Sequence, residues 1–158
     1  MNETRKPNRL AGFDYASCGV YFITVCTAGK CCILSEILPT FDMAEPCEIR
    51  LTAIGREVEK AINAIGEHYE SVTVDRFVIM PNHIHLLLRI AAPEDGRNVS
   101  VHSVIGSLKR AVTRSVSRPI WQKGFYDHVI RNPRDHAEHW KYIDANPMRW
   151  IEDEYYLP

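Results

Sequence analysis

The sequence lacks any long apolar run. No stretch approaches the ~20 consecutive apolar residues that a membrane-spanning helix needs, and residues 1–7 lack the apolar segment of a signal peptide. Cysteine is present in an odd number and without a C-x-x-C pair, which argues against a disulfide framework and against a zinc knuckle. The five cysteines are Cys18, Cys26, Cys31, Cys32 and Cys47. We therefore expect a cytoplasmic protein that does not contact a membrane.

The chain also lacks an excess of charge of either sign. Its formal net charge is -1, so composition gives no general reason to expect a nucleic acid partner. Hydrophobic residues make up 46% of the 158 residues, which is typical of one folded domain, expected here over residues 1–158. Basic side chains nevertheless form two clusters, one near the N-terminus and one that starts at Lys109. The clusters contain Arg5, Lys6, Arg9, Lys109, Arg110 and Arg114, and on charge alone they fit solvated faces better than contact with DNA.

The order of periodic segments predicts an α+β fold. Buried strands are expected at residues 19–27, 72–80 and 83–90, with short extended pieces at 32–34 and 48–51. Helices are expected to follow Thr52, Ser100 and Asn132 as N-caps, and Pro147 should end the last one near Ala145. Helices alternating with strands that can pair antiparallel favour a ferredoxin-like sheet with packed helices.

Two histidines stand out on the third predicted strand. Side chains alternate along a strand, so His83 and His85 share one face while Ile84, Leu86 and Leu88 face the core. Two imidazoles at this spacing can bind one metal ion. The same spacing also fits two histidines that are merely solvated on a polar face, and a third ligand must come from elsewhere.

The last predicted helix offers further candidates. Tyr142 and Asn146 are four residues apart and therefore lie on one helical face, which His139 shares. The structural alternative is that Tyr142 packs in the core and Asn146 caps a helix that Pro147 stops, because the residue before a proline avoids helical geometry. Spacing alone leaves both interpretations open.

Several blocks of sequence resemble one family. Residues 77–88, FVIMPNHIHLLL, closely resemble the strand pair of the REP-associated tyrosine transposases, which are relatives of the insertion-sequence-200-like transposases. Similar blocks follow the same order along nearly the whole chain: RLAGFDY at 9–15, YFITVCT at 21–27, WQKGFYDHVIRN at 121–132 and YIDANP at 142–147.

The resemblance implies a function and a set of site residues. The family's ferredoxin-like domain holds one divalent ion, Mg²⁺ or Mn²⁺, and a helix tyrosine attacks single-stranded or hairpin DNA to form a 5′-phosphotyrosine. Carried over by motif, the metal ligands are His83, His85 and Asn146, and the nucleophile is Tyr142. Related insertion-sequence enzymes carry a glutamine where this chain has Asn146.

Other interpretations remain open at this stage. Tyr126 is the rival nucleophile, in a segment expected to be an irregular strand or loop. Histidine-triad nucleotide hydrolases would need a third alternating histidine, but position 87 is leucine. A DNA-hairpin-binding protein without cleavage activity and a zinc-dependent phosphohydrolase are the alternative functions. The sequence leaves open whether one chain or a homodimer builds the active site.

Overall fold

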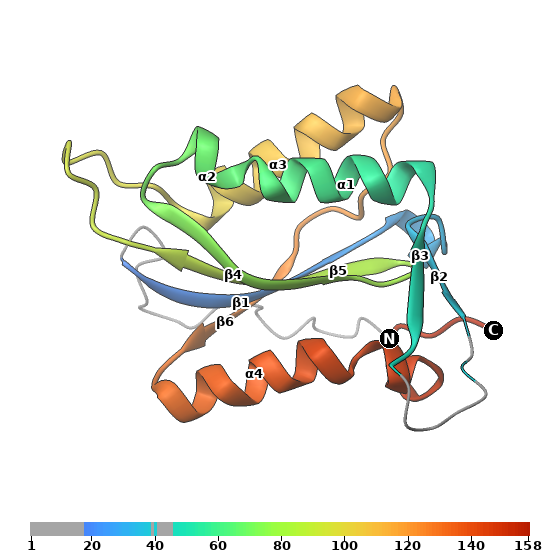
Figure 1. Cartoon of the computed structure of the whole chain (residues 1–158). Helices are drawn as coiled ribbons and strands as arrows, with labels where there is room; N and C mark the ends of the chain where they lie inside the picture. The colour runs from blue at the N-terminus through green and yellow to red at the C-terminus, as the bar shows by residue number, and fades with distance from the viewer. Residues whose placement is uncertain (1–17, 39, 41–45) are drawn as a thin grey trace, which may run out of the picture.

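A four-stranded antiparallel sheet organises the chain, and helices cover both of its faces (Figure 1). The computed structural model describes residues 18–38, 40 and 46–158. The helices and strands are β1 (Gly19–Cys26), β2 (Ser35–Leu38), β3 (Glu48–Leu51), α1 (Ala53–Asn63), α2 (Ile65–His68), β4 (Val72–Ile79), β5 (His83–Ile90), α3 (Val101–Val116), β6 (Tyr126–Ile130) and α4 (Pro133–Ala145). Short 3₁₀ helices occupy Ala28–Lys30 and Pro147–Glu152.

The strand order confirms the predicted α+β, ferredoxin-like plan. The order is β4-β5-β1-β6, so β1 pairs antiparallel with both β5 and β6. β2 and β3 form a separate two-stranded sheet. Helices α1 and α3 pack on one face of the main sheet, and α4 packs against the other face (Figure 1). In the described part of the chain, no helix has the length and apolarity needed to cross a membrane.

The main core lies between the sheet and the α1–α3 layer. It contains Ile84, Leu86 and Leu88 of β5, as the alternation of side chains predicts. A smaller cluster on the opposite face joins Leu87 to Ile143 of α4. Strand β5 is therefore buried on both sides, and its α4-facing side chains lie in a second, partly polar layer.

The predicted N-caps are confirmed at all three long helices. The side chains of Thr52, Ser100 and Asn132 accept hydrogen bonds from the backbone N–H groups of Gly55, Ser103 and Asp135. The boundaries of some other elements differ from expectation. The first short extended piece, expected at residues 32–34, forms β2 three residues later, and the first helix breaks at Ala64 into α1 and α2.

Strand β6 is the main element that differs from the sequence-based prediction. Tyr126 was expected in an irregular strand or loop, but it begins a regular strand that pairs with β1. Tyr126 lies opposite Thr24, and His128 lies opposite Phe22. This edge strand therefore brings Tyr126 and His128 to the α4-facing side of the sheet, beside Thr24 and Phe22.

Helix α4 is attached to β4 by ionic contacts. His136 contacts Asp75 at 3.0 Å, and the Arg76 guanidinium lies 2.7 Å from Asp144. Asp75 is also paired with Arg89 of the neighbouring strand at 2.6 Å. Burial acts to raise the pKa of Asp75, but hydrogen bonds from Arg89 and His136 outweigh it, and the net pKa is lowered.

We expect Gly55→Ala to destabilise the protein strongly. A Cβ atom at Gly55 would lie 1.9 Å from the carbonyl oxygen of Leu34, so the start of α1 could not keep its contact with the segment before β2. The loss should exceed about 2 kcal/mol in urea unfolding. Gly66→Ala is the control, because its Cβ would meet only the Val72 carbonyl oxygen at 3.6 Å. Equal stability of the two variants would contradict this account.

We also expect Asp75→Asn to lower stability by about 1 kcal/mol at neutral pH. The folded-state pKa of Asp75 is depressed, so its contribution is present above the unfolded pKa and is lost as pH falls through the folded pKa. The difference between wild type and variant should therefore shrink below about pH 4. Urea unfolding at several pH values measures it, and a difference independent of pH would argue against the ionic role.

Candidate metal and nucleophile site

The two histidines of β5 point toward α4 and are shielded from solvent. His83 is 0% exposed and His85 is 1% exposed. The interpretation that they are solvated on a polar face is therefore wrong. Their Nε2 atoms face each other at 3.1 Å. The structure thus brings the predicted pair together, as the alternation along β5 requires.

Each histidine ring also forms a hydrogen bond through Nδ1, the nitrogen that does not face the other histidine. The side-chain amide of Asn82 donates to the carbonyl oxygens of Lys30 and Tyr155, which leaves Asn82 Oδ1 as an acceptor. His83 Nδ1 lies 2.8 Å from this oxygen and must donate to it. A neutral His83 therefore has its lone pair at Nε2.

The neighbouring strand supplies the matching contact for the second ring. His85 Nδ1 lies 2.8 Å from Thr24 Oγ1, because Thr24 of β1 is the register partner of His85. A hydroxyl can accept or donate, so His85 can place its lone pair at either nitrogen. When His85 Nδ1 donates to Thr24, both Nε2 lone pairs face the same point, as two ligands of one cation would.

Burial keeps both rings neutral at neutral pH. It lowers the pKa of His83 to about 4, an effect that the Asn146 side chain only partly offsets. Burial also lowers the pKa of His85 well below its ordinary value, and the neighbouring His83 and His139 act in the same direction. Neutral imidazole is the form that binds metal ions.

Helix α4 brings its candidate residues to the same place. Tyr142 lies with its ring centroid 5.3 Å from that of His85, and it is 41% exposed. Burial has the largest effect on the pKa of Tyr142 and raises it, and the Asp153 carboxylate acts in the same direction. The Asn146 side chain, one turn later, contacts Tyr142 and lowers its pKa. The net pKa of Tyr142 is raised, so the phenol is protonated at neutral pH.

Asn146 does not leave helical geometry as the residue before Pro147 was expected to do. It has φ -57° and ψ -43°, and the chain continues into the 3₁₀ helix Pro147–Glu152. Helix α4 itself ends at Ala145, as predicted. The continued turn keeps the Asn146 side chain inside, where its Oδ1 atom is buried with no hydrogen-bond partner among the described residues.

Asp153 is a candidate ligand that no pattern in the sequence predicted. Its Oδ2 atom lies 3.8 Å from His83 Nε2, and the group formed with both histidines has ligand atoms within 4.8 Å of one another. Burial raises the pKa of Asp153. In the sequence Asp153 is one of three consecutive acidic residues near the C-terminus, and no local pattern indicates that the 3₁₀ helix returns it to β5.

The residues present fit a divalent cation. Two neutral imidazoles face a carboxylate that burial makes costly to ionise without a counter-ion. The orphaned oxygen of Asn146 is a fourth donor, and its side chain contacts His83. A buried polar atom without a partner is unusual in folded proteins, and a cation would satisfy it. Nitrogen and oxygen ligands of this kind suit several divalent metals.

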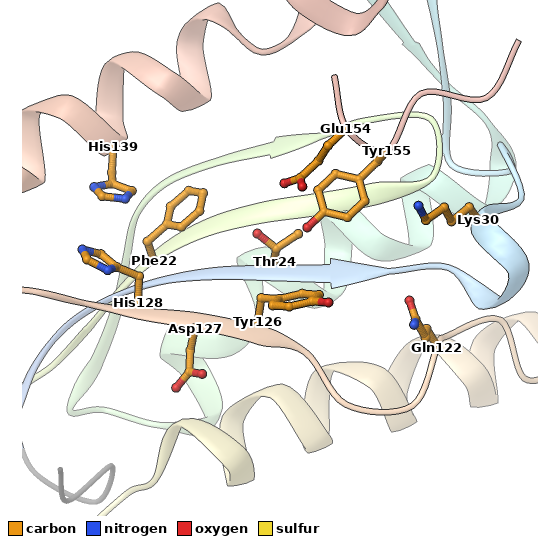
Figure 2. A pocket seen from close by; sticks show the side chains of 10 residues that line it. All are labelled: Phe22, Thr24, Lys30, Gln122, Tyr126, Asp127, His128, His139, Glu154 and Tyr155. Carbon is orange, nitrogen blue, oxygen red and sulfur yellow. The ribbon is translucent and has the colours of Figure 1, made fainter. Parts of the chain in front are cut away.

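Two adjoining pockets lie beside this group. One, of about 300 Å³, is lined by His85, Tyr142 and Glu154, among others. The other, of about 480 Å³, is lined by Lys30, Gln122 and Tyr155 at one end and by His128 and His139 at the other (Figure 2). Because Glu154 lines both, the pockets meet over the sheet.

The rival tyrosine lines the larger pocket. Tyr126 is 42% exposed and lies opposite Thr24, which separates it from His85 across the sheet. Both tyrosines therefore lie on the α4-facing side. Tyr142 differs in sharing an edge-on ring contact with His85 and a side-chain contact with Asn146.

The basic residues predicted for DNA contact are not gathered at this site. Arg5, Lys6 and Arg9 lie outside the described residues. The other three are on α3, on the opposite face of the sheet from α4 (Figure 1). Arg110 and Arg114 line a separate groove of about 380 Å³ between α3 and the α1–α2 segment.

Lys109 has structural contacts of its own. Its ammonium group donates to the carbonyl oxygens of Gln122 and Gly124, and burial lowers its pKa. Lys109 therefore ties α3 to the segment before β6, which contributes Gln122 to the larger pocket. Its role in DNA contact stays a prediction.

Comparisons with known proteins identify related chains. No family model matches the sequence. A Haemophilus influenzae protein described only as uncharacterized is 27% identical over 97% of this chain and 93% of its own length. A second protein of that bacterium, assigned as a REP-associated tyrosine transposase, is 29% identical over 86% of this chain and 74% of its own. The REP-associated tyrosine transposase of Escherichia coli K12 is 28% identical over 50% of this chain and 47% of its own.

A solved structure shares the fold. The structure of a REP-associated tyrosine transposase bound to a REP hairpin superposes with a TM-score of 0.62 and 23% identity, covering 89% of this chain and 73% of that one. The α+β plan with its antiparallel sheet is thus the plan of a solved transposase. Two relatives, 29% and 28% identical to this chain, carry the name REP-associated tyrosine transposase, so the chain is similar in sequence to members of that family.

Proposed function

We propose that this protein cleaves and rejoins single-stranded DNA through a covalent bond to Tyr142. The observation that carries the proposal is the contact between the partly exposed Tyr142 ring and His85, at 5.3 Å between centroids, beside a buried group of metal-ligand type. A nucleophile must lie next to the group that activates its phosphate. Tyr142 meets this requirement while remaining accessible to a DNA strand.

The proposed substrate is hairpin DNA with a single-stranded segment. The REP-associated tyrosine transposase whose fold this chain shares was solved bound to a REP hairpin, and we extend that substrate class to this chain. Tyr142 lines a pocket of about 300 Å³, and aromatic side chains such as Tyr126 and Tyr155 line the adjoining pocket. Aromatic rings suit the stacking of unpaired bases.

The proposed metal ligands are His83, His85 and Asn146, as the family resemblance implies, with Asp153 as a further ligand. Mg²⁺ or Mn²⁺ is the ion we propose, because phosphoryl chemistry combines these ions with oxygen ligands and open positions. Bound there, the cation would neutralise charge on the phosphate oxygens.

Tyr142 forms and breaks the covalent bonds in the proposed reaction. Tyr142 Oη forms a bond to phosphorus while the P–O3′ bond breaks, which leaves a 5′-phosphotyrosine. The phenol gives up its proton, and the departing oxygen takes one to become a 3′-hydroxyl. A second 3′-hydroxyl can attack the phosphotyrosine in reverse and rejoin DNA without an external energy source. Asn82 and Thr24 position the two histidines throughout.

The two alternative functions make different predictions. A hairpin-binding protein without cleavage activity would bind DNA but form no adduct with it. A zinc-dependent phosphohydrolase would use water as its nucleophile, so its activity would survive removal of the Tyr142 hydroxyl. The accessibility of Tyr142 and its contact with Asn146 favour the covalent route.

Tyr142→Phe should abolish the DNA adduct while leaving folding and hairpin binding intact. The substitution removes only the attacking oxygen of a half-exposed side chain. The measurement is denaturing electrophoresis of labelled hairpin DNA incubated with Mn²⁺, followed by peptide mapping of any linked band. Tyr126→Phe is the matched control, because Tyr126 has similar exposure and lies on the same side of the sheet. An adduct that persists in Tyr142→Phe and disappears in Tyr126→Phe would assign the chemistry to Tyr126.

Replacing both His83 and His85 by glutamine should abolish cleavage and weaken Mn²⁺ binding by about 100-fold or more. Glutamine is used because the rings are buried, and alanine would leave cavities that destabilise the fold. Calorimetric titration with Mn²⁺ measures binding separately from activity, and His68→Gln, an exposed histidine of α2, is the control. Unchanged Mn²⁺ affinity in the double variant would refute the assignment of these ligands.

A further inference from the structure

A second group of metal-ligand type lies where β6 meets the start of α4. It consists of His128, Asp135 and His139, whose ligand atoms all lie within 4.8 Å of one another. His128 comes from the edge strand β6, and the other two come from the first two turns of α4. The sequence analysis considered His139 only as a neighbour of Tyr142. The geometry gives His139 closer partners.

The contacts within the group are short and converge on one carboxylate. His128 Nε2 lies 3.0 Å from Asp135 Oδ2, and His139 Nδ1 lies 3.0 Å from Asp135 Oδ1. The two imidazole rings are stacked, with centroids 4.7 Å apart and planes at 20°. His128 Nε2 also lies 3.2 Å from Asp135 Oδ1, so one ring nitrogen of each histidine contacts the same carboxylate.

The carboxylate is held in its ionised form. Burial acts to raise the pKa of Asp135, but the backbone N–H of Arg131 and the side chain of His128 outweigh it, and the net pKa is lowered. Asn132, the N-cap of α4, also fixes Asp135 by accepting a hydrogen bond from its backbone N–H. A rigid, ionised carboxylate beside two imidazoles is the donor set that binds divalent transition metals, Zn²⁺ among them.

This group is separate from the one around His83. The Phe22 ring stands between them, 5.1 Å from the His85 ring on one side and 4.7 Å from the His139 ring on the other. His128 pairs with Phe22 in the sheet, whereas His85 pairs with Thr24, which lies two residues further along β1. An apolar ring thus divides two polar groups that share one side of the sheet.

The position of the group leaves room for a bound ion. His128 and His139 both line the pocket of about 480 Å³, at the end away from Lys30 and Gln122 (Figure 2). Their side chains are 44% and 23% exposed, so an ion could enter without unfolding α4. Metal sites that bind solvent or substrate commonly have three protein ligands and one open coordination position. This group has three ligands and faces a pocket.

We propose that His128, Asp135 and His139 bind a divalent transition-metal ion such as Zn²⁺, independently of the ion proposed at His83 and His85. Without metal, both ring nitrogens donate to the carboxylate, and His139 Nδ1 also contacts the Asp135 carbonyl oxygen at 2.9 Å. On binding, each ring moves its proton to the other nitrogen, and the ion takes the place of both protons. The bound ion links β6 to α4, the helix that carries Tyr142.

The competing interpretation is that Asp135 only pairs with two histidines to hold the helix start. That role needs no metal, so metal affinity decides between the two. The test uses the His83→Gln and His85→Gln double variant as the starting protein, so that its result does not depend on the proposed catalytic site. Zn²⁺ is titrated by calorimetry, and Co²⁺ is titrated by visible absorption.

The starting protein should bind one Zn²⁺ equivalent, and further replacement of His128 and His139 by alanine should weaken binding by about 100-fold. Co²⁺ should give the visible bands of nitrogen and oxygen ligands. Intense ultraviolet thiolate absorption would instead assign the metal to exposed cysteines such as Cys31 and Cys32 and overturn the proposal. His68→Ala is the control and should change nothing. Affinity within twofold of the starting protein after loss of His128 and His139 would equally overturn it.

Folding of each variant is checked by circular dichroism and by melting without metal. If the variant lacking both histidines does not fold, the single variants His128→Ala and Asp135→Asn carry the test. His128 is the most exposed member of the group, and asparagine keeps the volume of Asp135. Each should bind Zn²⁺ at least about tenfold more weakly than its parent, and unchanged affinity in both would overturn the proposal.

Discussion

The architecture of the site depends on keeping two imidazole rings buried, neutral and face to face. His83 and His85 can occupy a layer between sheet and helix only because each has one nitrogen satisfied by a neighbour, Asn82 or Thr24. Burying polar groups without such partners would cost several kcal/mol. The hydrogen bonds therefore do two things at once: they make burial tolerable, and they leave the Nε2 atoms converging on one point.

In this ferredoxin-like fold, the main apolar core and the candidate site lie on opposite faces of the sheet. One face of the sheet packs on α1 and α3 with a continuous apolar core. The other face carries the polar groups and is covered by α4 and the segment after it (Figure 1). Because β5 contributes to both layers, its alternating side chains place Ile84 and Leu86 in the core and the histidines in the site. The core can therefore be optimised for packing while the opposite face retains buried polar atoms.

Much of this arrangement could be predicted from the sequence, because it follows from local periodicity. The alternation around His83, the caps at Thr52 and Asn132, and the helical spacing of Tyr142 and Asn146 are confirmed. Other features depend on contacts between segments distant in sequence. Strand β6 is short and has an edge position, so its pattern is weak without its partner β1. Asp153 reaches His83 only through the 3₁₀ helix after Asn146, which no spacing rule indicates.

The number of residues along α4 fixes the distance and the rotation between its contacts with β6 and its contacts with β5. Asp135 meets β6 at the first turn, while Tyr142 and Asn146 meet β5 near the last. Inserting one residue between them would rotate one end relative to the other by about 100° and shift it by about 1.5 Å. Residues 92–98, in the loop between β5 and α3, lie instead at the surface, and all but Pro93 are exposed. Changes in chain length among related proteins are thus expected in that loop, whereas the number of residues from 135 to 146 should be invariant.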